Sequence, residues 1–195
     1  SESHDEVANG KARVPQEINN DDPTGWHAKK RSTLAAGLLF TSPGIPMIFQ
    51  GQEFLQGEWF RDNVPLDWHM NEEYHGVARM YRDLIWLRLN RDGVSRGLCG
   101  QNVAVTHVND QQNLIAFQRW DQHGDGDDVM VIANCGYEVK EGYRIGMPQS
   151  GEWKLRFNSD ASIYSDDFQN TLSTHLTATD EPQDGLPASA EVTIA

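Results

Sequence analysis

The sequence predicts a two-part fold: an α/β portion in residues 1–95 followed by an all-β domain in residues 96–195. Apolar residues recur at helical spacing in the first part, whereas short strand-like runs separated by Gly-rich turns follow residue 100. Regular short strands of this kind are typical of an antiparallel β-sandwich. We therefore expect the boundary between the two parts near residues 92–102.

The first part contains two predicted helices and one predicted strand. Helical spacing indicates a helix over residues 24–40, with Thr24 as its N-cap and a Ser-Pro-Gly sequence after its end. The apolar run at residues 45–49 favours a short, fully buried strand of the parallel type. A second helix is expected over residues 72–89, with Asn71 as its cap. Its apolar stripe would consist of Tyr74, Val77, Tyr81, Leu84, Ile85 and Leu89.

The second part contains several predicted strands and one polar connection. Clusters of Gly, Ser and Asp separate the strands and mark the turns between them. The polar segment at residues 170–188 is expected to be a loop. The predicted strands span residues 103–107, 114–120, 128–134, 143–146, 153–158 and 191–194.

The composition excludes some partners. Asp and Glu outnumber Lys and Arg 29 to 16, giving a formal net charge of −13, so we expect neither nucleic acid nor an anionic membrane as a partner. No apolar run approaches the roughly 20 residues that span a bilayer. Cys99 and Cys135 do not form a disulfide framework, and we expect Cys135 to be a buried, reduced thiol. This cysteine usage favours a cytoplasmic protein.

Polar side chains gather at two places in the first part. His4 and Asp5 stand among polar neighbours, and Gln50, Gln52 and Glu53 follow the predicted strand directly. A loop of some 20 residues with two tryptophans comes next, and loops of this length inside a compact domain are usually functional. Both groups therefore suggest parts of one active site.

Several short motifs resemble those of one enzyme family. Ser-His-Asp-Glu-Val at residues 3–7, Pro-Gly-Ile-Pro at residues 43–46, Phe-Gln-Gly-Gln-Glu-Phe at residues 49–54 and Pro-Leu-Asp-Trp at residues 65–68 occur in one order. They resemble the α-amylase superfamily of glycoside hydrolases and transglycosylases, and its 1,4-α-glucan branching enzymes most of all. The resemblance implies the last two βα units of a (β/α)₈ TIM barrel, followed by an antiparallel C-terminal β-sandwich of α-amylase type.

The resemblance also implies roles for individual residues. Asp5 would be the carboxylate that stabilises the transition state by bonding sugar hydroxyls. Gln52 and Glu53 suit a bracing role at the rim better than chemistry, Trp68 suits packing of the loop, and Lys11 suits sugar binding and plain solvation equally. We expect no metal and no cofactor. The implied substrate-binding residues are His4, Lys11, Gln52, Glu53 and Trp59.

The implied reaction is retaining transglycosylation that branches an α-1,4-glucan such as glycogen, starch or a maltooligosaccharide. Two alternatives stay open: α-amylase-type hydrolysis of the same bond, and a non-catalytic β-sandwich that binds carbohydrate or has a structural role. The family's nucleophilic Asp and acid/base Glu belong to barrel strands that the chain lacks. We therefore expect a C-terminal fragment of a larger enzyme, inactive by itself, whose sequence leaves the oligomeric state open.

Overall fold

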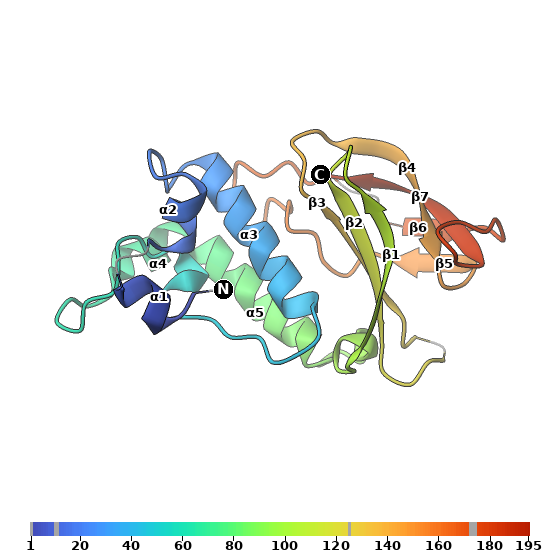
Figure 1. Ribbon diagram of the computed structural model, residues 1–195, viewed down its shortest axis with the longest axis horizontal. Coiled ribbons are helices and arrows are strands. Elements are labelled where there is room, and N and C mark those ends of the chain that lie inside the picture. The colour runs from blue at the N-terminus through green and yellow to red at the C-terminus, as the bar shows by residue number, and fades with distance from the viewer. Residues whose placement is uncertain (1, 10–11, 125, 172–174) are drawn as a thin grey trace.

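The computed structural model describes residues 2–9, 12–124, 126–171 and 175–195. It shows a helical part beside a β part, with one long connection running back between them (Figure 1). The helical part contains α1 (His4–Ala8), α2 (Val14–Ile18), α3 (Trp26–Thr41), α4 (Trp68–Glu73) and α5 (His75–Arg88), together with the 3₁₀ helix η1 (Gln52–Phe54). A second 3₁₀ helix, η2 (Arg96–Leu98), leads into the β part.

Helix α3 confirms the first predicted helix, but its cap differs. The helix begins at Trp26 behind Gly25, whose carbonyl oxygen accepts the backbone N–H of Lys29 at 3.1 Å, so Thr24 is not the N-cap. At the other end, the hydroxyl groups of Thr41 and Ser42 donate to carbonyl oxygens of the last turn, each at 2.7 Å. The carbonyl oxygen of Leu38 thus accepts both the hydroxyl and the backbone N–H of Ser42, the latter at 2.9 Å.

The predicted helix at residues 72–89 is two helices, because an earlier cap starts the first of them. Oδ1 of Asp67 accepts the backbone N–H of His69 at 3.0 Å, so α4 begins at Trp68. Asn71 therefore lies inside α4 and caps nothing. The backbone breaks at Tyr74, and α5 then buries Val77, Met80, Tyr81 and Leu84. The predicted stripe was too wide, since Ile85 and Leu89 are exposed.

The predicted buried strand at residues 45–49 is wrong for this structure. The backbone there is extended, yet it forms no ladder with any described residue. Ile45 is 97 % exposed and Met47 is 54 % exposed, and only Ile48 packs on the helical core. A parallel strand needs neighbours on both sides for its N–H and C=O groups, and an apolar run cannot supply them by itself.

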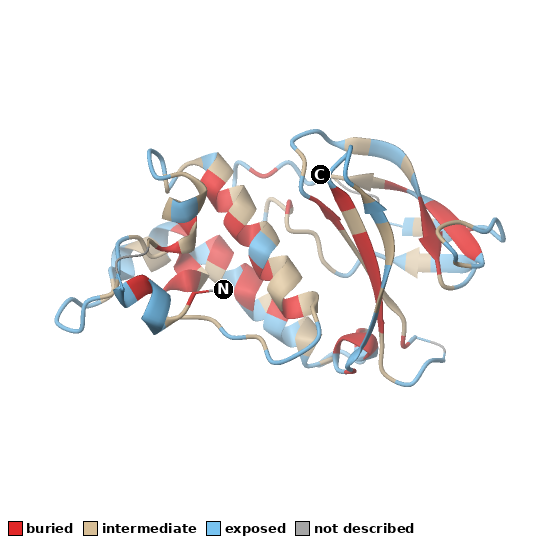
Figure 2. Cartoon of the chain, viewed as in Figure 1, coloured by how far each residue is buried: buried red, intermediate tan, exposed pale blue. Residues whose placement is uncertain are grey.

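One apolar cluster holds the helical part together, and the β part contributes to it. Buried residues line the facing sides of α3 and α5 (Figure 2). Tyr164 and Phe168, from the connection between β5 and β6, complete the same cluster. The remaining buried members are Ala36, Phe40, Phe54, Leu55, Tyr74, Val77, Met80, Tyr81 and Leu84.

The β part is all antiparallel, as the sequence predicts. Its sheets have the orders β1-β2-β3, β4-β7 and β5-β6, and they enclose a second core rich in alanine, with Ile145 and Val192 among its members. The strands are β1 (Asn102–Asn109), β2 (Leu114–Trp120), β3 (Val129–Asn134), β4 (Lys140–Met147), β5 (Gly151–Lys154), β6 (His175–Ala178) and β7 (Ala188–Ile194).

Two predictions in the β part need correction. The strand expected at residues 153–158 is β5, which begins earlier, at Gly151, and ends at Lys154, where it pairs with His175 of β6. The segment expected as a loop at residues 170–188 contains β6, whose Leu176 packs on the second core opposite Trp153. The few apolar residues of this polar segment therefore suffice for a short strand.

Arginine side chains join the two parts. Arg119 of β2 is fully buried; Nε donates to the carbonyl oxygen of Asn102 at 2.9 Å, and Nη1 donates to that of Thr41 at the end of α3. Arg31 of α3 reaches in the opposite direction and donates to the carbonyl oxygen of Cys135 at 2.6 Å. Cys135 itself is exposed, as is Cys99, so the expectation of a buried thiol was wrong. No described helix is long and apolar enough to cross a bilayer.

Candidate functional site

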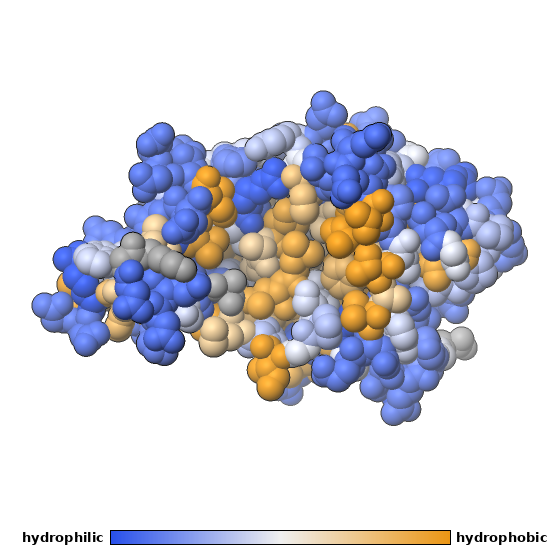
Figure 3. Space-filling view, in the orientation of Figure 1, coloured by the Kyte–Doolittle hydropathy of each residue, from blue (hydrophilic) through white to orange (hydrophobic). Residues whose placement is uncertain are grey.

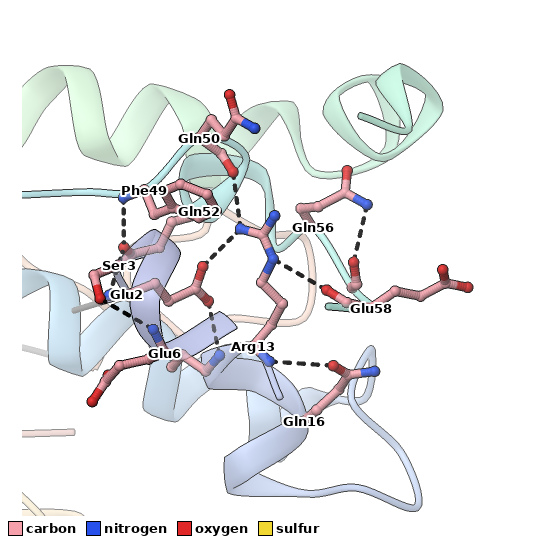
Figure 4. Close-up of polar contacts among 12 residues, drawn as sticks. Glu2, Ser3, Glu6, Arg13, Gln16, Phe49, Gln50, Gln52, Gln56 and Glu58 are labelled. Atoms are coloured by element: carbon pink, nitrogen blue, oxygen red, sulfur yellow. Dashed lines mark hydrogen bonds and ion pairs between the residues drawn. The ribbon is translucent and has the colours of Figure 1, made fainter. Parts of the chain in front are cut away.

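A buried ion pair connects segments at the start of the chain (Figure 4). Nη1 of Arg13 lies 2.8 Å from Oε2 of Glu2, and these side chains are only 2 % and 3 % exposed. The same guanidinium donates to the carbonyl oxygens of Gln50 at 2.9 Å and Glu58 at 3.2 Å. One buried cation therefore contacts three stretches of chain at once.

Helix α1 presents two predicted site residues to solvent, Asp5 as the expected catalytic carboxylate and His4 as an expected substrate-binding residue. Its N-cap is Ser3, whose Oγ accepts the backbone N–H of Glu6 at 3.4 Å, and Val7 is buried beneath it. Nε2 of His4 lies 3.1 Å from Oδ1 of Asp5, and their side chains are 71 % and 77 % exposed. A carboxylate in the first turn also suits the positive end of the helix. The pair can therefore contact a ligand that arrives from solvent.

Gln52 lies at the turn after the extended segment. Gly51 adopts φ of 87°, which glycine tolerates without strain, and the turn leads into η1. The side chain of Gln52 is buried, and its Oε1 accepts the backbone N–H groups of Glu2 and Phe49, each at 3.3 Å. Gln52 therefore braces the backbone next to Ser3, His4 and Asp5.

Glu53 and Tyr81 lie beside this brace. Oε2 of Glu53 is buried and has no hydrogen-bond partner within the described parts of the chain. Burial raises the pKa of Tyr81 above its ordinary value, a hydrogen bond with Gln52 lowers it, and the carboxylates of Glu2 and Glu53 raise it. The phenol of Tyr81 is therefore neutral at physiological pH.

The two tryptophans of the following loop are accessible. Trp59 is 49 % exposed and follows Glu58, whose carbonyl oxygen is held by Arg13. Trp68 is 63 % exposed, and its ring packs on Phe54 with 5.6 Å between centroids. Lys11 lies outside the described residues.

The two predicted polar segments lie next to each other in the structure, but the predicted site side chains that the structure describes on one segment do not bond those on the other. Glu2, next to the His4–Asp5 segment, bonds Gln52 directly, yet no hydrogen bond or ion pair among the described residues joins Asp5 to Gln52, Glu53 or Trp59. Sequence reasoning missed Glu2, Arg13 and Tyr81. A lone arginine in the sequence Ala-Arg-Val-Pro was the available signal, and it does not identify the partners of Arg13.

A metal site or a cavity elsewhere in the described residues would be another candidate site. The described residues contain no group of three His, Cys, Asp or Glu side chains placed to hold a metal ion. An open cavity of about 590 Å³ lies between α3 and the β part, where apolar side chains gather along the middle of the face in Figure 3. Of the predicted site residues that the structure describes, none lines this cavity.

Three aromatic side chains of the β part, Tyr143, Trp153 and Tyr164, make contacts within the protein. Tyr164 is buried in the helical core. Tyr143 Oη lies 2.8 Å from Nε2 of His107 and accepts a hydrogen bond from Asn109 at 2.9 Å. The indole of Trp153 donates to the carbonyl oxygen of Gln149 at 3.1 Å. These contacts suit packing more than a sugar-binding surface.

Comparisons with known proteins agree with this architecture. Residues 105–195 match the family model described as "Alpha amylase, C-terminal all-beta domain". The chain is 34 % identical over 166 residues to 1,4-alpha-glucan branching enzyme GlgB 1 of Xanthomonas euvesicatoria pv. vesicatoria (strain 85-10), covering 83 % of this chain and 22 % of that protein. It is 33 % identical over 200 residues to GlgB of Shewanella baltica (strain OS195), covering 100 % of this chain and 26 % of that protein.

Solved structures show a similar fold. A pullulanase from Anoxybacillus sp. LM18-11, crystallised with maltotetraose, superposes with a TM-score of 0.55 and 17 % identity, covering 92 % of this chain and 25 % of that one. The chain spans about a quarter of the length of the two branching enzymes. Residues 105–195 therefore match the C-terminal all-β domain of the α-amylase family, and the chain as a whole is similar in sequence to 1,4-α-glucan branching enzymes.

Proposed function

We propose that the chain is the C-terminal portion of a 1,4-α-glucan branching enzyme and contributes Asp5 and His4 to its active site. The observation that carries this proposal is the exposed pair on α1, 3.1 Å apart, next to a buried network that includes the Gln52 turn. The relatives named as branching enzymes support it. The ligand would be an α-1,4-glucan such as glycogen, starch or a maltooligosaccharide.

We further propose that residues 1–95 form the last two βα units of a (β/α)₈ barrel and residues 96–195 the appended β domain. The order of α3, an extended segment and α5 supports this placement. So does the apolar surface that these elements leave exposed, which includes Ile45, Met47 and Trp86. Neighbouring barrel strands would cover that surface and pair with the extended segment.

The proposed chemistry keeps the anomeric configuration. A nucleophilic carboxylate and an acid/base carboxyl, about 5–5.5 Å apart, would come from the remainder of the enzyme. Asp5 would accept hydrogen bonds from sugar hydroxyls that strengthen as the ring approaches an oxocarbenium-like transition state, and His4 would donate one to the same sugar. Transfer of a glucosyl chain is redox-neutral, and we propose no cofactor for it.

The other predicted residues have supporting roles in this proposal. Gln52 would brace the rim, in keeping with the two backbone N–H groups that its side chain accepts. Glu53 would contribute at that rim the oxygen that has no hydrogen-bond partner among the described residues, and Trp59 an exposed ring for a sugar face. Lys11 stays a candidate for a sugar hydroxyl. We also propose a cytoplasmic location, based on two free cysteines far apart in sequence.

The test compares the complete enzyme that contains this chain with its Asp5→Asn variant on amylose. Branching forms α-1,6 linkages without adding reducing ends, whereas hydrolysis adds one reducing end for each bond cut. We expect α-1,6 signals in the proton NMR spectrum at a constant number of reducing ends, and a loss of about 10²–10³-fold in kcat for Asp5→Asn. Asp62→Asn, an exposed carboxylate on the loop, is the control.

Each outcome of this test has a clear meaning. A rise in reducing ends without α-1,6 linkages would replace branching by hydrolysis, the alternative that the same residues serve. Full activity in the Asp5→Asn variant would remove Asp5 from the active site and with it the proposal.

A further inference from the structure

Arg13 lies at the centre of the buried network rather than at its edge. Its Nη1 contacts the carboxylate of Glu2 and the carbonyl oxygen of Gln50, its Nε contacts the carbonyl oxygen of Glu58, and its guanidinium carbon lies 5.0 Å from the centre of the Phe49 ring. All four partners surround one 2 % exposed side chain (Figure 4). The planar guanidinium directs its N–H groups, so it fixes directions as well as distances.

Glu2 extends the network to the backbone on either side of α1. Its Oε1 accepts the backbone N–H of Val14 at 2.8 Å, while Oε2 receives Arg13. Its backbone N–H donates to Oε1 of Gln52 at 3.3 Å. The short segment that begins at Glu2 and carries His4 and Asp5 is therefore anchored immediately before α1, and Arg13 anchors the chain after it.

A buried ion pair is a costly way to fill space. Apolar residues of similar volume often stabilise a protein as well as a buried pair or better, so this pair needs a reason beyond packing. Its contacts suggest one, because they join the segment bearing His4 and Asp5 to the turn at Gln50 and to Glu58, the residue before Trp59. One guanidinium therefore contacts both the segment that precedes His4 and Asp5 and the residue that precedes Trp59.

We propose that Arg13 is a positioning residue: paired with Glu2, it sets the backbone carrying His4 and Asp5 against the loop carrying Gln52 and Trp59. This inference rests on the proposed function of those residues as glucan contacts. The side chain of Arg13 is buried, so other segments would contact the substrate. It acts through the segments that do, and small errors in their placement reduce the rate of the chemical step more than substrate binding.

The first experiment measures hydrogen–deuterium exchange in the 195-residue chain. Arg13→Lys keeps the charge and loses the planar fork, so we expect amides in residues 49–58 to exchange about 10- to 100-fold faster. The matched control is Arg61→Lys in the same loop, where the exposed guanidinium lies 3.2 Å from the carboxylate of Glu58. In the Arg61→Lys variant, the amides of residues 49–58 should exchange at the same rate as in the parent chain. If Arg13→Lys does not fold, the Glu2→Gln variant is used instead. Its side-chain amide oxygen can still accept the backbone N–H of Val14, while the ionic partner of Arg13 is lost.

The second experiment measures kinetics in the complete enzyme with the same variants. We expect Arg13→Lys to lower kcat by about 10²-fold while KM and the pH profile of the rate stay nearly unchanged. A residue that only stabilises the fold would instead lower the melting temperature and leave kcat per folded molecule intact. Arg61→Lys should keep both kinetic constants.

The outcomes separate this inference from the proposed function. Unchanged exchange at residues 49–58 would overturn the proposed anchoring by Arg13. Faster exchange with unchanged kcat, in an enzyme that Asp5→Asn inactivates, would overturn positioning while the proposed function stands. Full activity of Asp5→Asn would reject the proposed function, and the exchange result would still decide whether Arg13 holds the two segments together.

Discussion

Nζ of Lys30 on α3 lies 2.5 Å from Oδ1 of Asp160, a residue 130 positions further along the chain. The side chain of Asp160 is only 4 % exposed, and its other oxygen accepts the backbone N–H of Thr171 at 3.0 Å. Beside it, Lys29 contacts Asp167 at 2.7 Å. These contacts hold the connection between β5 and β6 on α3, which is why Tyr164 and Phe168 belong to the helical core.

Removal of the Asp160 carboxylate should therefore weaken both parts of the molecule. Asp160→Ala leaves the Lys30 ammonium and the N–H of Thr171 without their acceptor, and we expect the free energy of unfolding to fall by about 3 kcal/mol. Urea denaturation followed by tryptophan fluorescence measures it. Asp166→Ala, at an exposed position six residues away, should change stability by less than about 0.5 kcal/mol. Equal effects of the two variants would contradict this role of Asp160.

Gly76 allows the same connection to approach α5. A Cβ atom at this helical position would lie 2.2 Å from the carbonyl oxygen of Tyr164, so the two backbones would have to move apart. Helix propensity favours alanine over glycine by about 1 kcal/mol, but overpacking costs about 1–3 kcal/mol or more. We expect Gly76→Ala to lower the melting temperature in a calorimetric scan. Gly57→Ala, where a Cβ meets nothing within 4 Å, should not.

Acid should destabilise the β part through Asp127. Burial alone would raise the pKa of this carboxyl, but the backbone N–H groups of Gln122 and Asp121 outweigh it and hold the pKa below its ordinary value. A carboxyl with a depressed folded-state pKa stabilises above its unfolded value, about 3.9, and this contribution is lost as the pH falls through the folded-state pKa. The charged form of Asp127 thus supports the β2–β3 turn near neutral pH.

The measurement compares melting temperatures from about pH 6 to about pH 2. Asp127→Asn should be less stable near neutral pH and should lose less stability on acidification than the parent chain. Asp110→Asn, an exposed residue in the β1–β2 turn, serves as the control and should follow the parent curve. Parallel curves for Asp127→Asn and the parent would show that this carboxyl does not carry the acid sensitivity.

The sequence predicted the elements that local patterns determine. Helix α3 and strand β2 follow from spacing and alternation within one segment, and both are confirmed. The extended residues 45–49 carry the same kind of apolar signal, but a strand also depends on neighbours, and Ile45 has none to cover it. Four-residue β6 was missed because its stability comes from β5 and the second core rather than from its own polar sequence.

The candidate site was predictable in part for the same reason. Motif resemblance made His4, Asp5 and Gln52 candidates, because the motifs that contain them follow one another in a recognisable order. The role of Arg13 was not predictable, because its hydrogen-bond partners lie 11, 37 and 45 positions away in the sequence. The burial of Glu2 likewise depends on that long-range pairing, and nothing in a polar N-terminal sequence indicates it.

Replacing Glu53 should raise stability and lower activity. Its Oε2 is buried without a partner among the described residues, and such an oxygen costs about 1–3 kcal/mol of desolvation. Glu53→Met, similar in volume, should therefore raise the free energy of unfolding of the 195-residue chain by about 1 kcal/mol, measured by urea denaturation. Glu72→Met, at an exposed position, is the control and should leave stability nearly unchanged.

If Glu53 serves the glucan rim, Glu53→Met should also lower kcat/KM of the complete enzyme, because strained or unsatisfied groups persist where function retains them. A less stable Glu53→Met chain would mean that the carboxylate has a stabilising partner after all.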